Sequence, residues 1–374
     1  MNIVKIVYGQ DRGGIYSCET QYLQFLKEKG VHITLVIVGK GDSVETYKSL
    51  ADQTIQLENV GVRFEGGLIK RFQLLYNAYA FGRRNVNEVF NVINAAEVDA
   101  VIYRREAYMF LGSFIAKKLK TSCYWHMANS INNSSSRLLH KVLSRVLEIT
   151  PIANSIYTSQ TFGKGCELVV YPGFNDERLI QNSSNDQLAL GIDPTKPIYG
   201  MIARVCNEKA QDLLVEGFVH SQAAEEGAYL LLAGNYSDKG FFEKIRQKAG
   251  KLWGSQVIYL GLLEEVASFY NTIDVAINSR RNAEPFGISI AEALFMKKPV
   301  ISYYKGGPEE MIQHGENGWL VYEISSEAYE MAFNQSFNDK NKWTEMGIRS
   351  FEKSHKFNSK VNVEKLLKII SKQY

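Results

Sequence analysis

The chain has 374 residues, which is too long for one typical domain and suits two domains of about 150–200 residues each. Its hydrophobic content of 45% and charged content of 22% are those of a globular protein, and no apolar stretch approaches the roughly 20 residues that a membrane-spanning helix requires. The opening residues, MNIVKIVYG, read as a first strand without the longer apolar region of a signal peptide, so we expect a cytoplasmic location.

The net charge of +3 hides an asymmetry between the two halves. Residues 1–172 carry 20 Lys and Arg against 14 Asp and Glu, a charge of +6, whereas residues 173–374 carry 23 against 26, a charge of −3. A basic half is typical of a protein that contacts an anionic partner. Since the sequence contains no nucleic-acid-binding module, we expect an anionic membrane surface or an anionic acceptor. Scattered cysteines without a C-x-x-C pair favour buried free thiols over disulfides or zinc. They are Cys18, Cys123, Cys166 and Cys206.

The first residues alternate strand, helix and strand. Residues 3–8 form an apolar strand, residues 10–14 form a turn into a helix from Ser17 to Lys29, and residues 32–39 form a second strand. This order predicts a βαβ unit and hence a parallel sheet with its functional loops at the carboxyl ends of the strands. The glycines in the turn, Gly13 and Gly14, have two readings: a plain tight turn, or a loop whose backbone approaches a ligand or an acceptor.

The same alternation continues to about residue 175. Residues 70–84 carry basic residues at both ends and aromatic residues between them, so they form either a core helix with charged ends or a helix on a membrane interface. His126 falls at or just beyond a strand end, which in a doubly wound sheet faces the ligand; it is either a structural or a functional histidine. We expect strands at 55–64, 98–105, 151–155 and 166–175, a further strand that ends near His126 within residues 121–130, and helices at 70–84, 107–120, 136–148 and 156–163.

A break at Pro172–Gly173 marks the expected domain boundary, and the second half then repeats the first pattern. Two domains of this kind would face each other across a cleft, which is a common place for a ligand. An amphipathic helix at about 360–372 ends the chain. We expect strands at 197–205, 228–236, 256–263, 274–279 and 299–304, and helices at 211–221, 238–249 and 264–271.

Residues 282–318 carry the most informative pattern. Glu284 and Glu292 stand eight positions apart, and Pro285 and Gly287 between them favour a loop before a helix start. The N-terminus of that helix would form an anion site between two carboxylates that can accept hydrogen bonds from sugar hydroxyls. The plain alternative is that Glu284 is a solvated loop residue and Glu292 a charge on the helix surface.

Several motifs in the second half then coincide with those of one family. Arg204 and Lys209 form an R-x4-K pair after a strand, Glu284 and Glu292 form an E-x7-E pair, and residues 306–321 read GGPEEMIQHGENGWLV. Leu-Ala-Gly at 232–234 and Tyr-Leu-Gly at 259–261 stand between them. In this order the motifs resemble those of the retaining glycosyltransferases of family 4.

The resemblance implies the GT-B fold, an α/β architecture of two Rossmann-like, doubly wound parallel-sheet domains that face a central cleft. The first, acceptor-binding domain would span residues 1–172 and include the C-terminal helix at about 356–374. The second, donor-binding domain would span residues 173–355.

The resemblance also implies roles for individual residues around the donor. Arg204 and Lys209 would bind the diphosphate and offset the charge of the leaving group. Glu284 would contact hydroxyls of the donor sugar, and Glu292 would contact the ribose. The backbone N–H groups of residues 286–288 would reach the phosphates or the sugar; these residues are Phe286, Gly287 and Ile288.

Further roles follow from the same resemblance. Leu262 and Glu264 would lie near the base, Gly14 close to the phosphates or the acceptor, and His126 against the donor sugar. The chain departs from the family where Lys209–Ala210–Gln211–Asp212 replaces K-G-x-D and where Pro172–Gly173–Phe174–Asn175 replaces N-G-V-D. No D-x-D motif occurs, so we expect transfer without a metal ion or other cofactor.

The expected activity is transfer of a hexose-type sugar from a UDP- or GDP-type nucleotide-diphosphate donor to an acceptor hydroxyl, with retention of the anomeric configuration. The acceptor would be a glycan or lipid-linked molecule in cell-envelope polysaccharide, lipopolysaccharide or glycolipid synthesis, reached at the inner face of the membrane. A front-face route, in which the leaving phosphate helps to deprotonate the acceptor, fits the cations better than a carboxylate nucleophile does. Two alternatives stay open: a GT-B-like nucleotide-sugar epimerase and a non-catalytic nucleotide-sugar-binding protein.

Overall fold

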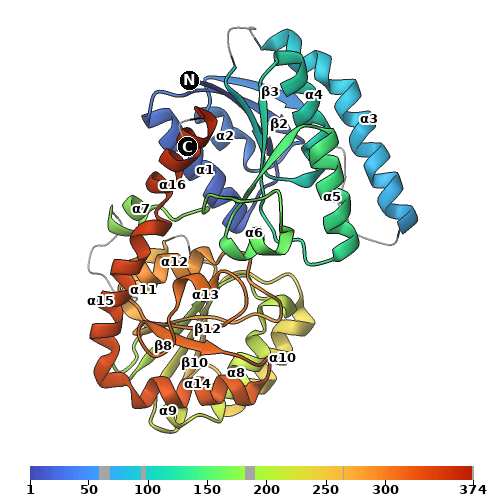
Figure 1. Cartoon of the computed structure of the whole chain (residues 1–374). Helices are drawn as coiled ribbons and strands as arrows, with labels where there is room; N and C mark the ends of the chain where they lie inside the picture. The colour runs from blue at the N-terminus through green and yellow to red at the C-terminus, as the bar shows by residue number, and fades with distance from the viewer. Residues whose placement is uncertain (59–67, 94–97, 182–189, 264, 373–374) are drawn as a thin grey trace. The chain divides into compact units, whose positions relative to one another are not determined.

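The chain folds into two α/β units, each with its own parallel sheet. The computed structural model describes residues 1–58, 68–93, 98–181, 190–263 and 265–372 (Figure 1). Unit 1 comprises Met1–Gly173 together with Ser359–Tyr374, and unit 2 comprises Phe174–Asn358. Each unit is built on one parallel sheet with helices packed on it, which confirms the predicted fold class.

The sheet of unit 1 has the strand order β3-β2-β1-β4-β5-β6-β7, and all its pairings are parallel. Its central strands are apolar runs buried on both faces, as sequences such as Ile33–Val38 predict, because helices cover both sides of a parallel sheet. The strands are β1 (Asn2–Tyr8), β2 (His32–Val38), β3 (Gln53–Leu57), β4 (Ala100–Tyr103), β5 (Ser122–His126), β6 (Ile149–Ala153) and β7 (Leu168–Val169).

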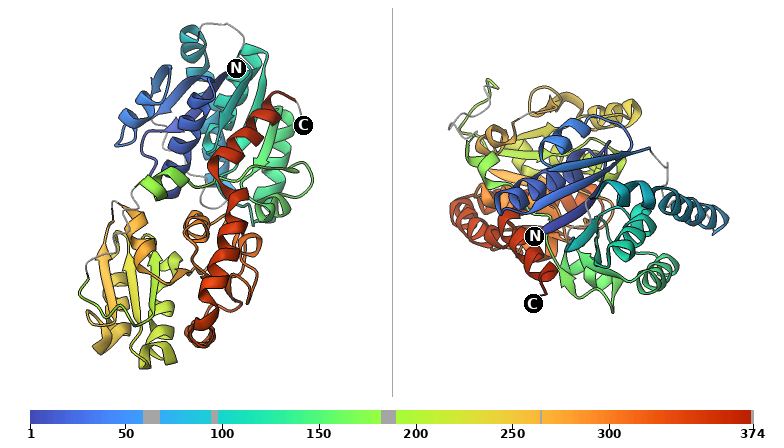
Figure 2. Two further views of the ribbon diagram at one scale, coloured as in Figure 1. Left: turned by 90° about the vertical axis from the view of Figure 1, so that its left-hand side faces the viewer. Right: turned by 90° about the horizontal axis from the view of Figure 1, so that it is seen from above.

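The helices of unit 1 come mainly from the first half of the chain, and the C-terminal helix α16 joins them. α16 packs against α1, and α3 packs against α4; in Figure 2 the red C-terminal helix lies against the blue N-terminal part of unit 1. The helices are α1 (Gly13–Glu28), α2 (Val44–Ser49), α3 (Leu68–Val92), η1 (Glu106–Tyr108), α4 (Met109–Leu119), α5 (Ser134–Val146), α6 (Ile156–Phe162) and α16 (Ser359–Ile370).

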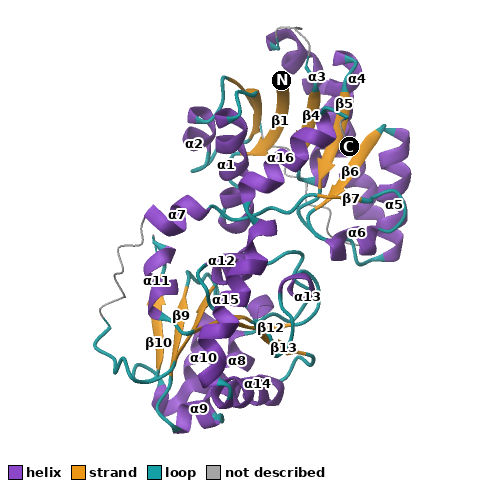
Figure 3. Ribbon diagram, turned by 60° about the vertical axis from the view of Figure 1, so that its left-hand side comes forward, coloured by secondary structure: helices purple, strands orange, loops and turns teal. Residues whose placement is uncertain are grey.

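The sheet of unit 2 has the order β10-β9-β8-β11-β12-β13, again with parallel pairings (Figure 3). The chain reverses direction across the sheet between β8 and β11, the switch point at which doubly wound sheets bind ligands. The strands are β8 (Ile198–Ile202), β9 (Tyr229–Ala233), β10 (Val257–Gly261), β11 (Val275–Asn278), β12 (Val300–Tyr303) and β13 (Gly318–Val321).

Helices cover both faces of this second sheet, and α8 packs on α10 and α14 while α12 packs on α15. Short 3₁₀ turns join several of them. The elements are α7 (Asp176–Gln181), η2 (Asn207–Lys209), α8 (Gln211–Val219), α9 (Gln222–Glu225), α10 (Lys239–Ala249), η3 (Gly250–Leu252), α11 (Val266–Thr272), α12 (Ile288–Phe295), α13 (Pro308–Met311), α14 (Ser326–Asn338), η4 (Lys340–Lys342), α15 (Trp343–Ser354) and η5 (His355–Phe357).

Three expectations need correction. The turn read at residues 10–14 ends earlier, because Gly13 already begins α1 with a φ of +60°. The strand expected at 166–175 is confined to Leu168–Val169, since the backbone N–H of Tyr171 donates to Asn362 Oδ1 of α16 (3.0 Å) instead of joining the sheet. The strand expected at 55–64 begins at Gln53 and ends at Leu57, and residues 59–64 lie outside the described residues.

Candidate functional site

The loop that carries Glu284 is fixed by a second, glycine-containing loop. The backbone N–H of Glu284 donates to Lys305 O (3.0 Å), and the N–H of Gly307 donates to Glu284 O (2.8 Å). A Cβ atom on Gly306 would lie 2.1 Å from Glu284 O, and one on Gly307 would lie 2.0 Å from Phe286 O. Only glycine permits so close an approach of two backbones. The Gly-Gly-Pro segment of the sequence therefore serves to position the loop of the first glutamate.

Two cations hold the Glu284 carboxylate. Lys209 Nζ lies 2.9 Å from Glu284 Oε2, and an Arg280 guanidinium nitrogen lies 2.8 Å from the same oxygen. The guanidinium of Arg280 also forms an ion pair with Glu208. Burial alone would raise the pKa of Glu284, but the charges and hydrogen bonds of Lys209 and Arg280 hold it below its usual value. Glu284 is therefore ionised. The side chains of Lys209, Arg280 and Glu284 are each less than one fifth exposed.

Both cations use one carboxylate oxygen. In the described part of the chain, Glu284 Oε1 accepts no hydrogen bond, so it has the capacity to accept one from a sugar hydroxyl. A carboxylate fixed through one oxygen and open at the other is suited to orient a hydroxyl-bearing ligand.

Arg204 follows β8 by two residues and is exposed. Its backbone oxygen accepts a hydrogen bond from Gln211 Nε2 (3.0 Å), while its guanidinium has no hydrogen-bond or ion-pair partner among the residues described. Arg204 is thus free to meet a diphosphate, a role that stays a prediction. The structure does not join it to the cluster of Lys209, Arg280 and Glu284.

The departure from K-G-x-D has a local consequence. Ala210 takes the left-handed conformation with a φ of +53°, which a glycine would adopt without the steric cost of about 1 kcal/mol or more. Asp212, two residues later, is 1% exposed and binds Arg281 (2.7 Å) and Lys244 (2.6 Å). The turn after Lys209 is therefore formed by a strained alanine, and a buried ion-pair cluster follows it.

Glu292 is buried within α12 and accepts a hydrogen bond from the hydroxyl of Tyr270 (3.1 Å). Burial raises its pKa, and Arg178 and the Tyr270 hydroxyl oppose that rise only in part. A buried position excludes the alternative that Glu292 is a solvated charge on the helix surface. Its contact with a ribose stays a prediction.

The segment before α12 combines a buried anchor with a positive-φ glycine. Phe286 is buried and packs against Phe357, with ring centroids 5.8 Å apart. Gly287 has a φ of +101° and precedes Ile288, the first residue of α12, whose first turn has no acidic residue. This end of the helix therefore keeps its partial positive charge. Leu262, expected near a base, is 71% exposed, and Glu264 lies outside the described residues.

In unit 1, His126 lies fully inside the protein. Its Nδ1 is 3.1 Å from a guanidinium nitrogen of Arg104, and its Nε2 is 2.8 Å from Val170 O. Nε2 therefore donates to Val170 O, and Nδ1 accepts from Arg104. Burial, followed by the charge of Arg104, lowers the pKa of His126 well below its usual value, so the ring is neutral. Glu19 binds Arg104 (2.9 Å) and Lys5 (2.7 Å) behind it. A hydrogen bond from His126 to a sugar would require that at least one of these two partners be exchanged.

Gly14 is exposed in the first turn of α1. The loop before it is fixed by Asp11, whose carboxylate accepts hydrogen bonds from Tyr47 (3.1 Å) and from the guanidinium of Arg105. Asp11 is buried, which raises its pKa, and Arg105 opposes the rise. The loop is therefore rigid at the carboxyl end of β1, and the expected approach of Gly14 to a ligand stays a prediction.

The sequence interpretation missed Arg280 and the buried cluster of Lys5, Glu19 and Arg104. The signal for Arg280 was its place in Ser279–Arg280–Arg281, directly after β11 at the carboxyl edge of the sheet. Lys5 stands inside an apolar strand and gave no sign of a partner, because Glu19 comes from a helix and Arg104 from the end of another strand.

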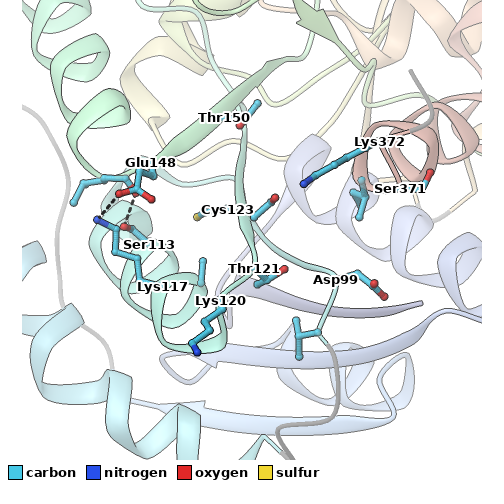
Figure 4. Close-up of a pocket in the computed structure, with 15 residues that line it drawn as sticks. Asp99, Ser113, Lys117, Lys120, Thr121, Cys123, Glu148, Thr150, Ser371 and Lys372 are labelled. Atoms are coloured by element: carbon cyan, nitrogen blue, oxygen red, sulfur yellow. Dashed lines mark hydrogen bonds and ion pairs between the residues drawn. The ribbon is translucent and has the colours of Figure 1, made fainter.

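A cavity of about 720 Å³ lies at the opposite, amino-terminal edge of the unit 1 sheet (Figure 4). Three lysines line it together with the carboxylates of Asp99 and Glu148, and Lys117 pairs with Glu148 (3.2 Å). The remaining lysines are Lys120 and Lys372. None of the predicted site residues borders this cavity, so it belongs to a different part of the unit.

Within the described ranges, no helix combines the length and the apolar character that a membrane crossing needs. The same ranges contain no group of three or more His, Cys, Asp or Glu side chains arranged to hold a metal ion.

The fold is that of the GT-B glycosyltransferases. HepE of Anabaena, in a crystal structure with UDP and glucose, matches with a TM-score of 0.76 and 17% identity over 99% of both chains. A glycosyltransferase from Rickettsia africae matches with a TM-score of 0.78 and 18% identity over 99% of this chain and 98% of that one. At these identities the likeness defines the fold alone.

Residues 183–353 match the family described as "Glycosyl transferases group 1", so this part of the chain is a group 1 glycosyltransferase domain. The trehalose synthase of Pyrococcus horikoshii is 28% identical over 173 residues, which are 44% of this chain and 41% of that protein. The lipopolysaccharide core biosynthesis glycosyltransferase LpsE of Rhizobium meliloti is 25% identical over 182 residues, which are 47% of this chain and 52% of that protein. The chain thus spans about half the length of these relatives.

Proposed function

We propose that the protein is a retaining glycosyltransferase of family 4 that moves a hexose-type sugar from a nucleotide-diphosphate sugar to an acceptor hydroxyl. The observation that carries this proposal is the cluster of Lys209, Arg280 and ionised Glu284 at the carboxyl edge of the unit 2 sheet, beside the N-terminus of α12. Cations and helix N–H groups suit a diphosphate, and an open carboxylate oxygen suits a sugar hydroxyl.

In the proposed reaction, the acceptor oxygen forms a bond to the anomeric carbon on the face from which the phosphate oxygen leaves. The bond from that carbon to the phosphate oxygen breaks, and the acceptor proton passes to the leaving phosphate. Lys209 and Arg204 stabilise the negative charge that develops on the diphosphate. Glu284 is an unsuitable nucleophile for a double displacement, because two cations bind its carboxylate and lower its basicity.

Unit 2 would bind the donor and unit 1 the acceptor. UDP and UDP-glucose bind to HepE, which favours a UDP-type donor here over a GDP-type donor. The relation to LpsE favours an acceptor in lipopolysaccharide or another envelope glycan, presented at a membrane surface. Because His126 is buried with both nitrogens bonded, we assign it a positioning role in unit 1. We further propose that transfer needs no metal ion, since the sequence lacks a D-x-D motif.

A calorimetric screen of nucleotide diphosphates and their sugars tests the proposal. We expect one nucleotide diphosphate to bind and its sugar to be consumed only when an acceptor is added, with unchanged activity in a chelator. Conversion of Lys209 to alanine should reduce turnover sharply, while Lys251→Ala, an exposed lysine of unit 2, should not. Conversion of the donor without acceptor would identify an epimerase, and tight binding without any turnover would identify a sensor. Either result would overturn the proposed transfer.

A further inference from the structure

Helix α5 of unit 1 presents three aliphatic side chains to solvent. Leu138 is 64% exposed, Val142 is 51% exposed and Val146 is 64% exposed. Their spacing of four residues places them along one side of the helix. Figures 1 and 3 show α5 on the outside of unit 1. An aliphatic row of this length covers no core in the described structure and needs another partner.

A row of basic residues runs beside this aliphatic row. Arg137, Lys141 and Arg145 also follow each other at intervals of four and each directly precedes one of the aliphatic residues. Arg145 is exposed, and its guanidinium has no hydrogen-bond or ion-pair partner among the described residues. Residues 107–147 contain six Lys and Arg and no Asp or Glu. Arg137 donates to Thr161 O (2.9 Å) and Lys141 Nζ lies 5.8 Å from the ring centroid of Phe162, so these two cations are half-buried. Arg145 is the cation of this row that is presented to solvent beside the aliphatic side chains.

The opposite side of α5 fixes the helix firmly to unit 1. His140 is buried and stacks on Trp125 with ring centroids 5.4 Å apart, and Ser144 is buried beside it. Asn133 caps the first turn by accepting a hydrogen bond from the N–H of Ser136 (3.1 Å). The aliphatic row thus faces outward because the packed side of the helix leaves it no other orientation.

The helix at residues 70–84, whose sequence also allows a membrane contact, differs in this respect. It forms part of α3, which packs against α4 with Leu74, Ala78 and Phe81 buried. Tyr76 and Tyr79 are exposed, but the aliphatic residues of this segment are used for packing. The reading of residues 70–84 as a core helix therefore describes α3 better, and α5 is the stronger candidate for a surface contact.

We propose that α5 docks unit 1 on an anionic lipid surface. Leu138, Val142 and Val146 would enter the boundary between headgroups and acyl chains, while Arg145 contacts a lipid phosphate. The charges of Arg137 and Lys141 would add to the attraction toward an anionic surface. A second copy of the chain fits this surface less well, because a symmetric contact would bring the same three positive charges against themselves. The inference deepens the proposed function, since it names the surface through which a lipid-linked acceptor would be reached.

Flotation with vesicles tests this docking. We expect the protein to bind phosphatidylcholine vesicles that contain about one third phosphatidylglycerol, to bind pure phosphatidylcholine vesicles much less, and to lose binding at high salt. The triple variant Leu138→Ser, Val142→Ser, Val146→Ser should reduce the partition coefficient by about tenfold or more. Arg145→Glu should reduce it by about fivefold or more.

A matched control removes exposed apolar side chains from unit 2. Met331 is 64% exposed and Ile348 is 51% exposed, so Met331→Ser, Ile348→Ser tests whether any loss of surface hydrophobicity weakens vesicle binding. We expect this variant to bind like the unchanged protein. Equal melting temperatures and circular dichroism spectra would show that the variants fold.

Three results would overturn the docking proposal. The first is that the unchanged protein does not bind anionic vesicles, and the second is that the triple variant binds them as well as the unchanged protein does. The third is that the unchanged protein sediments as a dimer and the triple variant as a monomer. Nucleotide binding by the triple variant separates this proposal from the proposed enzymatic function. Normal nucleotide affinity together with failed vesicle binding would reject only the membrane contact.

Discussion

Replacement of Arg280 by glutamine should weaken the proposed donor site through Glu284. The substitution removes the charge-assisted hydrogen bond of 2.8 Å to Glu284 Oε2 and the ion pair with Glu208. It leaves Lys209 in place at 2.9 Å from the same oxygen. Because Arg280 would act through Glu284, it is a positioning residue in this reasoning.

The magnitude follows from the two contacts. A hydrogen bond to a charged group contributes about 1.5–3 kcal/mol, and the side chains of Arg280 and Glu284 are 15% and 13% exposed, so solvent screens the contact little. Before the donor binds, Lys209 still holds the carboxylate, which favours the lower part of that range. The ion pair with Glu208 contributes less than about 1 kcal/mol because Glu208 is 41% exposed. We therefore expect kcat/KM to fall by roughly ten- to thirtyfold.

The pH profile gives a readout that a loss of folding would not mimic. Arg280 is one of the groups that lower the pKa of Glu284, so the carboxylate stays ionised to a lower pH in the unchanged protein than in the variant. Initial rates measured with the donor found by calorimetry should show an acid limb displaced to higher pH in Arg280→Gln. KM for the donor should rise more than kcat falls if Glu284 holds the sugar in the ground state as well.

The neighbouring arginine is a matched control. Arg281 binds Asp212 (2.7 Å) and makes no contact with Glu284, so Arg281→Gln should lower the melting temperature without moving the acid limb. The reasoning is refuted if Arg280→Gln keeps the donor affinity and the acid limb of the unchanged protein, or if Arg281→Gln moves that limb equally.

Two further substitutions test the framework of the site. Gly307→Ala should lower the free energy of unfolding by about 3 kcal/mol or more, because its Cβ would lie 2.0 Å from Phe286 O. The control Gly240→Ala, in α10, should be neutral or slightly stabilising in the same denaturant titration. Asp212→Asn should cost about 2–3 kcal/mol at neutral pH, because it leaves Arg281 and Lys244 without their shared carboxylate. Burial raises the pKa of Asp212, but Lys244 and Arg281 bring it below the usual value. The stability that ionised Asp212 contributes is therefore present above about pH 4, and it is lost as the pH falls through the lowered pKa. The difference between Asp212→Asn and the unchanged protein should therefore shrink in acid, and a constant difference would contradict this reasoning.

The strand pattern could be predicted from sequence because a parallel sheet needs buried apolar runs. Ile33–Val38 is such a run, and the glycine and helix signals around it imply the βαβ order. The prediction was weaker where distant segments decide the structure. The extended segment after β7 bonds to α16 through Tyr171 and Asn362, a contact that spans 191 positions and leaves no local pattern. The edge strand β13 has no clear strand signal in the sequence, because its four residues, Gly318–Val321, stand within a loop-like motif.

In the candidate site, too, some features follow from residues that are neighbours in the sequence, and others depend on residues that are far apart in it. Glu284 and the helix start at Ile288 follow from local turn and capping rules, and the structure places them as those rules predict. The pairing of Glu284 with Lys209 bridges 75 positions and could be suspected only from a family resemblance. Arg280 lies four residues from Glu284, yet an arginine in a loop is usually solvated, so its sequence position alone did not single it out.

Lys209 and Arg280 share one carboxylate oxygen but differ in what else they bind. Arg280 has a second carboxylate in Glu208, whereas the side chain of Lys209 has no other partner among the described residues. An anionic diphosphate would draw Lys209 away from Glu284 at the smaller cost, because Arg280 would have to leave two carboxylates. In the proposed reaction Lys209 would therefore turn toward the leaving group while Arg280 keeps Glu284 aligned with the sugar. This division of roles gives a physical reason for two cations at one carboxylate.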